Sequence, residues 1–243
     1  MKKINMNRPL IVAAIDGSED VVRSAKMAKK MGANLLEARI DLFSSKDIKN
    51  IGALLSKMKK TAGMPIIATV RGSKEQGLTA GTRHTAHLKD PERKDLLEKV
   101  LPFADILDIE LASDSINSGI IKLAHKIKKI VILSCHDFKS MPSKKRVNAL
   151  FRKFKSLGGD IFKIAATPKT PSDVNNFLAT CLSLKGTARI FIAMGEIGTP
   201  SRIAGFSCGS CMTYGYVNKP TAPGQLSVKE LSDYCSLFYS ARK

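Results

Sequence analysis

Long apolar runs are missing from this 243-residue chain, and cysteine is scarce. No apolar run approaches the roughly 18 residues that a membrane-spanning helix needs. The apolar stretch Leu10–Ile15, which follows a basic N-terminus, is short and predicts a strand rather than a signal peptide. The five cysteines are odd in number and widely spread, which argues against a disulfide scaffold. We therefore expect a cytoplasmic protein with no membrane partner.

Motifs for metal or dinucleotide binding are also missing. Cys208 and Cys211 form a C-x-x-C, but no second pair at metal-binding spacing and no nearby histidine accompany them. We expect two small thiols, buried or half-buried. No glycine-rich fingerprint follows the first predicted strand, and the glycine-bracketed segment 72–77 lacks the lysine and hydroxyl of a phosphate loop. That segment is predicted to be a turn.

Acidic residues are few: 21, against 40 basic residues, give a net charge of +19. A charge this large makes a basic nucleic-acid-binding protein one hypothesis to carry. The lysines are dispersed over several predicted outer helix faces, however, and no nucleic-acid-binding motif interleaves with them. Solvated faces that bind no nucleic acid, and that can help to attract an anionic substrate, are the favoured interpretation. These lysines are Lys57, Lys59, Lys60, Lys122, Lys126, Lys128, Lys129, Lys144, Lys145, Lys153 and Lys155.

Short β-rich apolar runs alternate with segments of helical periodicity throughout the chain. Near-continuous apolar runs are typical of parallel strands that are buried on both faces. In the helical segment Ser143–Leu157, five apolar residues fall on one face, and basic residues cover the rest. The eight predicted strands are Leu10–Ile15, Asn34–Asp41, Pro65–Arg71, Ala104–Leu111, Ile130–Asp137, Ile161–Thr167, Arg189–Gly195 and Met212–Val217.

Eight strand-then-helix units in about 240 residues predict an α/β fold, a single-domain (β/α)₈ TIM barrel over residues 1–243. A doubly wound open sheet is the alternative, but it usually has fewer strands at this length. In a barrel, active sites lie at the C-terminal ends of the strands.

Lys163 lies in the middle of an otherwise apolar strand, Ile161–Thr167. A buried ammonium group must find partners or lose its proton, and a lysine held away from water can attack a carbonyl carbon. Strand alternation places Lys163 on the face that points into the barrel lumen, whereas Phe162 and Ile164 face the helices.

Ionisable residues recur on the inward faces of five consecutive strands, near their C-terminal ends. Any one of them alone is consistent with a satisfied buried ion pair, but a whole set is costly to bury and favours a functional site. By the same alternation, Cys135 points away from the lumen. His84, His87 and His125 do not fit the pattern and receive no role. The inward groups are Glu37, Arg39, Asp41, Arg71, Asp108, Glu110, His136 and Lys163.

These groups permit imine chemistry. Lys163 can attack a ketone, and His136 can shuttle the protons that imine formation and elimination require. A carboxylate such as Glu110 can orient that histidine. The arginines can grip a substrate carboxylate through two parallel hydrogen bonds.

Six motifs, in order along the chain, resemble the type I 3-dehydroquinate dehydratase family, the Schiff-base dehydratases of the shikimate pathway. The resemblance runs from Leu10 to about Leu231. The motifs are Glu37-Ala38-Arg39-Ile40-Asp41, Asp108-Ile109-Glu110-Leu111, Ser134-Cys135-His136-Asp137-Phe138, Gly159-Asp160-Ile161-Phe162-Lys163-Ile164-Ala165, Ser201-Arg202-Ile203-Ala204-Gly205 and Ala222-Pro223-Gly224-Gln225.

The resemblance implies a syn elimination of water from 3-dehydroquinate that gives 3-dehydroshikimate, through an imine on Lys163. His136 would act as general acid and base, and Glu110 would position it. The imine nitrogen serves as the electron sink, so no metal or organic cofactor is implied. Family members are often homodimers, and a chain of this length is expected to be monofunctional.

The resemblance also implies substrate contacts. Arg202 would hold the substrate carboxylate, and Glu37, Arg39 and Arg71 would bind hydroxyls or organise the pocket. Thr221 would retain a hydroxyl where many members have serine, and Gln225 would close over the substrate on a lid, residues 219–225, in which Gly224 is flexible. Ala13 and Ala14 stand where a serine often occurs, so a contact from the first strand is in doubt. The alternative is a class I Schiff-base aldolase, which has the same barrel fold and also forms an imine on a lysine.

Overall fold

The computed structural model describes residues 4–6, 8–75 and 88–239, apart from the side chain of Lys74. His84 and His87, to which the sequence assigns no role, lie outside the described residues, as does the end of the predicted turn 72–77. Within the described residues, no helix is long and apolar enough to cross a membrane.

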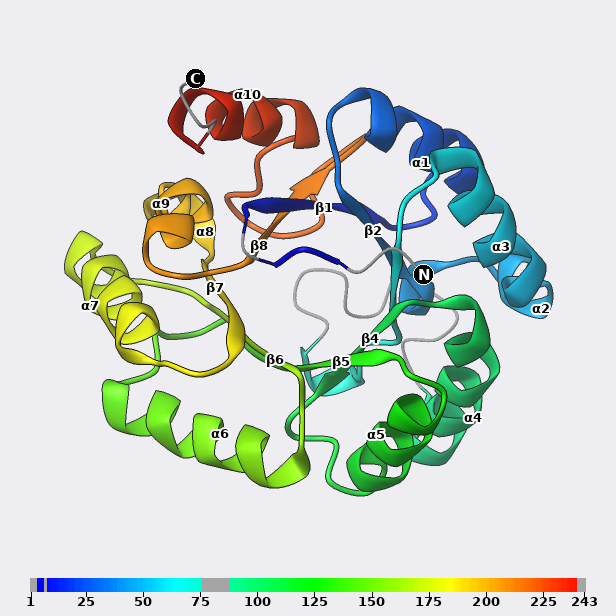
Figure 1. The fold of residues 1–243 in the computed structure, drawn as a ribbon, viewed down its shortest axis with the longest axis horizontal. Helices are drawn as coiled ribbons and strands as arrows, with labels where there is room; N and C mark the ends of the chain where they lie inside the picture. Colours follow the sequence, from blue (N-terminus) through cyan, green and yellow to red (C-terminus); the bar gives the residue numbers. More distant parts are fainter. Residues whose placement is uncertain (1–3, 7, 76–87, 240–243) are drawn as a thin grey trace.

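Eight parallel strands form a nearly closed barrel inside a ring of helices (Figure 1). Their order is β7-β6-β5-β4-β3-β2-β1-β8. Between β7 and β8 the barrel closes through a bridge of Arg189 and Ser210 and a hydrogen bond of 2.8 Å from Cys211 N to Arg189 O. The strands are β1 Leu10–Ile15, β2 Leu35–Arg39, β3 Ile66–Thr69, β4 Ile106–Glu110, β5 Ile130–Asp137, β6 Ile161–Ala166, β7 Ala188–Ala193 and β8 Met212–Tyr216.

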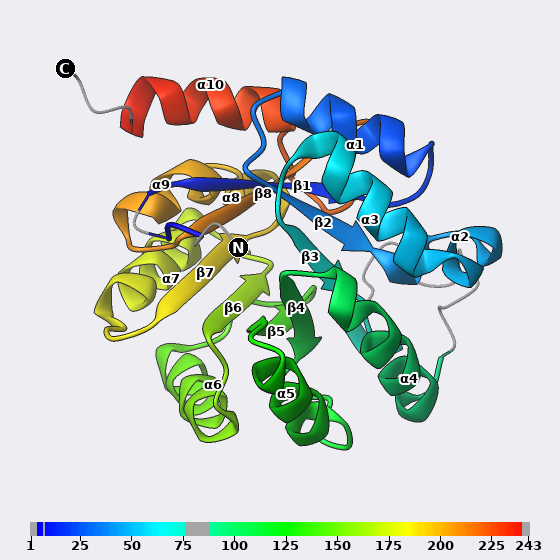
Figure 2. The ribbon, with the colours of Figure 1, turned by 45° about the vertical axis from the view of Figure 1, so that its right-hand side comes forward.

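Helices pack on the outside of every part of this sheet (Figure 2). They are α1 Val21–Lys30, α2 Ser45–Lys49, α3 Ile51–Ala62, α4 Asp90–Val100, α5 Asn117–Lys126, α6 Lys144–Leu157, α7 Pro171–Ser183, α8 Gly195–Gly198, α9 Ser201–Ser207 and α10 Val228–Tyr239. The predicted barrel is therefore confirmed. The predicted strands are correct in position and up to a few residues too long, because turns such as the 3₁₀ turn Ile40–Leu42 begin before the apolar run ends.

Two separate apolar clusters explain the near-continuous apolar runs. The larger cluster fills the space between strands and helices and includes Phe162, Ile164 and Leu36. The smaller cluster fills the lumen and includes Ile161, Ala165 and residues from other strands. Each strand therefore buries both faces, and the predicted alternation around Lys163 is confirmed.

Local signals in the sequence set the helix ends. Helix α6 begins after Ser143, whose side chain accepts a hydrogen bond from Arg146 N, and it ends at Gly158. Gly158 has φ +78°, a left-handed conformation that glycine adopts without a steric penalty. Val147, Leu150 and Phe154 of this helix are buried, as the periodicity predicts.

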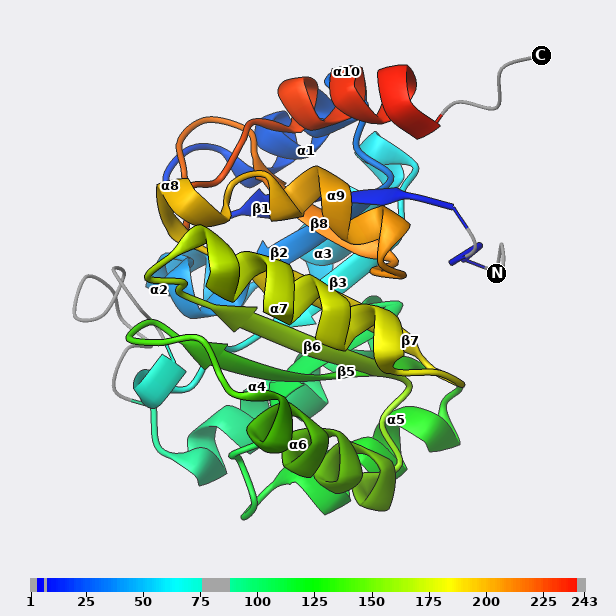
Figure 3. The ribbon, with the colours of Figure 1, turned by 90° about the vertical axis from the view of Figure 1, so that its left-hand side faces the viewer.

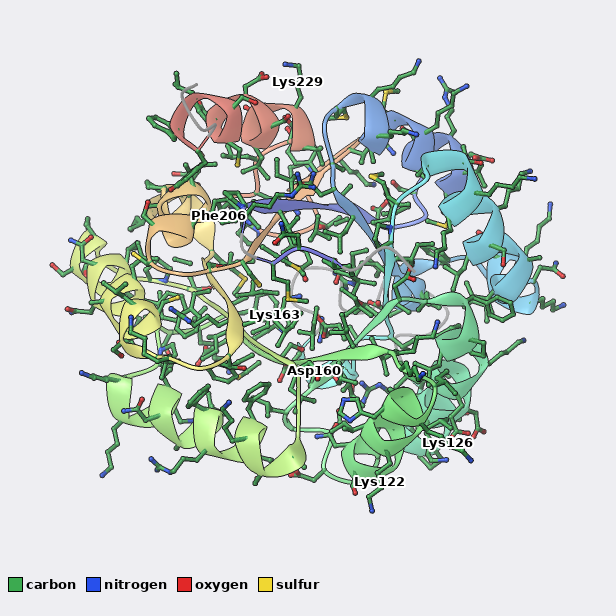
Figure 4. All side chains as sticks on the ribbon, in the orientation of Figure 1. Lys122, Lys126, Asp160, Lys163, Phe206 and Lys229 are labelled. Carbon is green, nitrogen blue, oxygen red and sulfur yellow. The ribbon has the colours of Figure 1, made fainter. Side chains whose placement is uncertain are left out.

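The surface lysines lie on separate helices. Lys122 and Lys126 project outward from α5, whereas Lys163 lies in the middle of the ring (Figure 4). The lysine positions given above as outer faces are exposed or half-buried, which confirms that prediction. The positive charge is thus spread over the outer helices. Among the lysines whose side chains the structure describes, Lys163 differs in being almost fully buried, at 3% exposure.

Candidate active site at the C-terminal end of the barrel

A pocket opens at the C-terminal ends of the strands and encloses, with its mouth, about 590 Å³ of empty space. All six predicted substrate-binding residues line it, together with Lys163 and His136, whereas Glu110 does not. The lining residues are Glu37, Arg39, Arg71, Glu75, His136, Phe138, Lys163, Ala165, Ile192, Met194, Arg202, Tyr214, Thr221, Ala222 and Gln225.

The even-numbered strands place Lys163 and three other side chains in one layer, and these three surround its nitrogen. Its Nζ lies 2.8 Å from Oδ2 of Asp108 on β4 and 3.9 Å from Oε1 of Glu37 on β2. The ring of Tyr214 on β8 lies against the same nitrogen, with its centroid 4.1 Å away. Layers built from alternate strands are the normal interior of this kind of barrel. Here the layer surrounds a cation with two carboxylates and an aromatic face.

Asp108 stays ionised in this layer. Burial works against its charge, but Arg71 and Lys163 outweigh burial and hold the pKa of Asp108 well below its usual range. The guanidinium of Arg71 lies 2.9 Å from Asp108 and donates to Ser134 Oγ at 2.8 Å. Because Asp108 holds no proton, it can pair with the lysine cation but cannot supply protons to a reaction.

His136 pairs with Glu75, not with Glu110. The Nδ1 of His136 lies 2.8 Å from Oε2 of Glu75, and the backbone N–H of His136 donates to the same oxygen at 2.9 Å. Burial raises the pKa of Glu75 to about 7 against the opposing effect of Arg71. Burial, with the charges of Arg71 and Lys163, holds the pKa of His136 well below its usual range. The ring is therefore neutral near pH 7, and Glu75 fixes Nδ1 so that Nε2 is left to act on a ligand.

The predicted pairing of Glu110 with His136 is corrected by this geometry. Glu110 Oε1 accepts hydrogen bonds from Arg71 at 3.1 Å and from Gly72 N at 2.8 Å, and its Oε2 accepts from Ser113 at 2.9 Å and from Arg93. Both oxygens are thus engaged away from the histidine. Strand alternation placed Glu110 on the correct face, but it could not show that two arginines would bracket its carboxylate.

Arg93 fixes this carboxylate from outside the barrel. It lies on α4, is 3% exposed, and donates to Val70 O, Glu110, Ser113 and Asp90. Glu110 in turn holds Gly72 N, at the start of the 3₁₀ turn Ser73–Glu75 that carries the partner of His136. Arg93 and Glu110 therefore support the segment that positions the histidine.

Arg202 supplies positive charge on the opposite side of the pocket. It donates to the backbone oxygens of Gly224, Pro223 and Tyr214, at 2.7, 3.1 and 3.3 Å, and within the described residues no carboxylate forms a salt bridge with it. Burial lowers its pKa to about 10, so the residue is still a cation at pH 7. A buried, unpaired guanidinium that lines a pocket is suited to a carboxylate ligand.

The loop after β8 closes one side of the pocket. The side-chain Oε1 of Gln225 accepts from Thr221 N at 2.7 Å and from Thr221 Oγ1 at 3.0 Å. Gly224 has φ +63° and packs against Gly195 so closely that an added Cβ would lie 2.1 Å from Gly195 O. The predicted lid is thus held in place by Arg202 and by its own hydrogen bonds.

A sequence model of the type I 3-dehydroquinase family matches residues 11–242 of this chain. The chain belongs to that family. A 3-dehydroquinate dehydratase of Hydrogenobaculum sp. (strain Y04AAS1) is 37% identical over 213 residues, which are 88% of this chain and 92% of the relative.

Solved structures of the family share the fold. The 3-dehydroquinate dehydratase of Geobacillus kaustophilus superposes with a TM-score of 0.87 at 28% identity, over 96% of this chain and 93% of that one. The type I enzyme of Clostridium difficile, crystallised with covalently modified comenic acid, gives a TM-score of 0.84 at 27% identity, over 95% and 92% of the two chains.

Three residues of this family member's site were not assigned a role from the sequence: Glu75, Arg93 and Tyr214. Glu75 lies in a short turn without periodicity, but its place four residues after Arg71, at the end of a strand, was an available signal. Arg93 lies on an outer helix whose charged pattern hides one buried position. Tyr214 has the pattern of an ordinary apolar strand residue.

Neither of the C-x-x-C cysteines lines this pocket. Cys211 is buried in the lumen cluster and Cys208 is half-buried after α9, and both are free thiols, as predicted. Burial raises the pKa of Cys211 to about 12. Among residues 4–6, 8–75 and 88–239, no group of histidine, cysteine and acidic side chains has an arrangement that could hold a metal ion.

Proposed function

We propose that this protein dehydrates 3-dehydroquinate to 3-dehydroshikimate, in the shikimate pathway of aromatic amino-acid biosynthesis, by way of a Schiff base on Lys163. The observation that carries the proposal is the pocket itself. A buried lysine, a neutral histidine and an arginine without a carboxylate partner among the described residues line one space. A ketone acid needs these three groups: a nucleophile, a proton shuttle and a carboxylate receptor.

The first half of the reaction forms the imine. The ammonium of Lys163 gives a proton to the neutral His136, and the amine nitrogen then adds to the ketone carbon. His136, now protonated, gives its proton to the former carbonyl oxygen. It then takes a second proton from the added nitrogen and passes it to the resulting hydroxyl, which leaves as water while the protonated C=N bond forms. Asp108 remains ionised throughout and keeps a negative charge beside the nitrogen.

The second half eliminates the hydroxyl group. His136, neutral again after imine closure, takes a proton from the carbon next to the imine. The electron pair moves to the nitrogen, and the resulting enamine expels the neighbouring hydroxyl. His136 protonates this hydroxyl so that it leaves as water, and hydrolysis of the imine releases the product and the free lysine. Glu75 keeps Nδ1 of His136 occupied through both steps, which leaves Nε2 as the nitrogen that gains and loses the proton.

The remaining pocket residues bind and orient the substrate in this proposal. Arg202 grips the carboxylate, and Thr221 and Gln225 close the loop beside it. Arg39 is held by Asp41 through hydrogen bonds of 3.1 and 2.8 Å, and Glu37 accepts from Thr69 at 2.9 Å, so both are oriented before the substrate arrives. Glu37, Arg39 and Arg71 then contact the substrate hydroxyls or hold the groups that do.

Borohydride trapping tests this function. Incubation with 3-dehydroquinate followed by reduction should leave an adduct on Lys163, located by mass spectrometry, and the absorbance of the conjugated enone product should rise in the untreated enzyme. An adduct elsewhere, or none, would overturn the mechanism. Retro-aldol cleavage of sugar phosphates without any turnover of 3-dehydroquinate would instead support an aldolase.

We also propose that the protein acts in the cytoplasm as a homodimer that associates through an apolar groove lined by residues on and next to α9 and α10. These two helices lie side by side (Figure 3). The groove holds about 1070 Å³ of empty space with its mouth, but it has no charged lining and lies away from Lys163. The groove is lined by Thr199, Pro200, Ile203, Ala204, Ser207, Leu226, Tyr234, Phe238 and Tyr239.

Charge favours this face for the contact. Residues 195–239 carry three basic and three acidic side chains, so the +19 of the chain resides elsewhere. Two copies that approach through lysine-rich helices bring like charges together, whereas residues 195–239 carry no net charge and present Leu237 and Phe238 at 66% and 63% exposure. The five cysteines are free thiols, which supports the proposed location in the reducing cytoplasm.

Sedimentation equilibrium tests the dimer. The wild-type protein should have twice the 26.4 kDa mass of the chain, and Phe238→Lys should reduce the mass to that of one chain. Phe103→Lys is the matched control, because Phe103 is also exposed but lies outside the groove. A monomeric wild type, or equal dissociation of both variants, would refute the assignment.

A further inference from the structure

Tyr214 is in closer contact with the reacting nitrogen than its ordinary sequence context suggests. Its side chain is buried, with 5% of the residue exposed, and the Nζ of Lys163 lies over its ring at 4.1 Å from the centroid. A cation within about 6 Å of an aromatic centroid is attracted by the negative face of the ring. At this distance, in a buried layer, the contact is a strong example of its kind.

The hydroxyl group of Tyr214 does not explain this placement. Among the described residues it has no hydrogen-bond partner, although it is fully buried. An unpaired buried hydroxyl costs free energy, so the side chain is not held there by its polar end. Its backbone oxygen accepts from Arg202 at 3.3 Å, and β8 pairs with β1, which fixes the strand. The ring face is therefore the part that contacts the chemistry.

The bonding around the nitrogen changes during the proposed reaction. An ammonium has three N–H donors, whereas a protonated imine has one. The N–H donors available to Asp108, which accepts from Lys163 Nζ at 2.8 Å, therefore decrease when Lys163 becomes an imine, although the positive charge remains. The attraction of an aromatic face requires only the charge, so it persists after the N–H groups are lost.

We propose that the ring of Tyr214 is a catalytic element that stabilises the protonated imine on Lys163. The proposal rests on the Schiff-base function given above. The ring stabilises the protonated imine relative to the neutral carbinolamine that precedes it and to the neutral imine. It thereby favours closure of the imine and keeps the nitrogen charged when it must accept the electron pair.

Substitutions that separate the ring from the hydroxyl test this role. Tyr214→Phe keeps the ring and should form the borohydride-trapped adduct at the wild-type rate. Tyr214→Leu removes the ring and should slow adduct formation roughly 2- to 30-fold, the range that corresponds to a cation–π contact of about 0.5–2 kcal/mol at about 1.36 kcal/mol per tenfold change. The recovery of the rate by phenylalanine distinguishes the ring from the hydroxyl.

A graded series keeps the test decisive if the leucine variant folds poorly. Phenylalanine analogues with one, two and three ring fluorines at position 214 retain the shape and progressively weaken the negative ring face. The trapping rate should fall stepwise along this series. Equal rates for all the analogues, or a loss in Tyr214→Phe as large as in Tyr214→Leu, would overturn the proposal. Absence of any adduct in the wild type would instead refute the Schiff-base function.

Discussion

Replacing Glu75 by glutamine is expected to stabilise the protein at alkaline pH while it slows catalysis. The carboxylate lies in the pocket beside His136, and burial raises its pKa from 4.5 to about 7. The folded protein therefore holds this proton more tightly than the unfolded chain does. A raised pKa contributes stability that is fully present below pH 4.5 and is lost as the pH rises through about 7.

The magnitude follows from the two pKa values. The difference between 4.5 and about 7 corresponds to about 3 kcal/mol at 1.36 kcal/mol per pH unit. Glutamine carries no charge at any pH, so Glu75→Gln should match the wild type near pH 4.5 and exceed its free energy of unfolding by up to about 3 kcal/mol at pH 8.5.

Catalysis should change in the opposite direction. One oxygen of Glu75 accepts both the backbone N–H and the Nδ1 of His136, and a glutamine carbonyl can replace it in shape but not in charge. The imidazolium that forms during turnover then lacks its counter-charge. We expect kcat to fall about 10- to 100-fold, at the low end of what general acid–base catalysis contributes.

Urea denaturation at pH 4.5, 7 and 8.5, with kcat measured on the same samples, tests both parts. Glu19→Gln is the matched control, since it removes the same charge at an exposed position outside the pocket. If the stability difference between Glu75→Gln and the wild type does not grow with pH, burial does not control this carboxylate. If kcat is unchanged, the charge of Glu75 does not stabilise the imidazolium of His136 during turnover.

Three further substitutions follow from the same contacts. Lys163→Ala should abolish turnover and borohydride trapping, but the variant should still fold because Arg71 continues to neutralise Asp108. Circular dichroism checks the fold and mass spectrometry checks the trapping. An adduct in the variant would contradict the assignment of Lys163. Arg93→Met should lower the free energy of unfolding by about 3–5 kcal/mol, because it removes one cationic partner of the buried Glu110 carboxylate. The control Arg146→Met, on the exposed side of α6, should have little effect in the same urea titration. Gly224→Ala should raise KM, because the added Cβ collides with Gly195 O and displaces the loop. Gly186→Ala is the control: Gly186 has a similar φ of +72°, and its added Cβ would have no atom within 4 Å, so this variant should lose a little stability and keep its KM. Equal KM values for the two variants would show that the loop tolerates the displacement.

Periodicity in the sequence was sufficient to predict the barrel and the inward direction of Lys163 and His136, whereas Arg202, Thr221 and Gln225 were assigned only through the family resemblance. Strands buried on both faces and apolar helix faces are local patterns, and the structure follows them within a few residues. Strand alternation also placed Lys163 and His136 inside, because the two faces of a strand differ by a fixed period of two. These inferences hold because each depends on neighbours along the chain.

Side-chain contacts between different strands and loops of the barrel were harder to predict from the sequence. Glu110 has the position and the charge of a histidine partner, yet Arg71 and Arg93 occupy its oxygens. The actual partner, Glu75, comes from a turn that no periodic pattern describes. Which carboxylate reaches which base depends on distances between different strands and loops, and those distances are set by strand tilt and helix packing.

The sequence by itself determined that eight strands enclose a lumen and that a lysine and a histidine point into it. The tertiary structure decided the environment of those two groups: an aspartate that stays ionised, a glutamate whose pKa is raised to about 7, and a tyrosine face against the nucleophile. The physical reason is that side-chain direction follows from local backbone geometry, whereas burial and electrostatic coupling depend on residues far apart in the chain that the closed barrel brings within a few ångströms of one another.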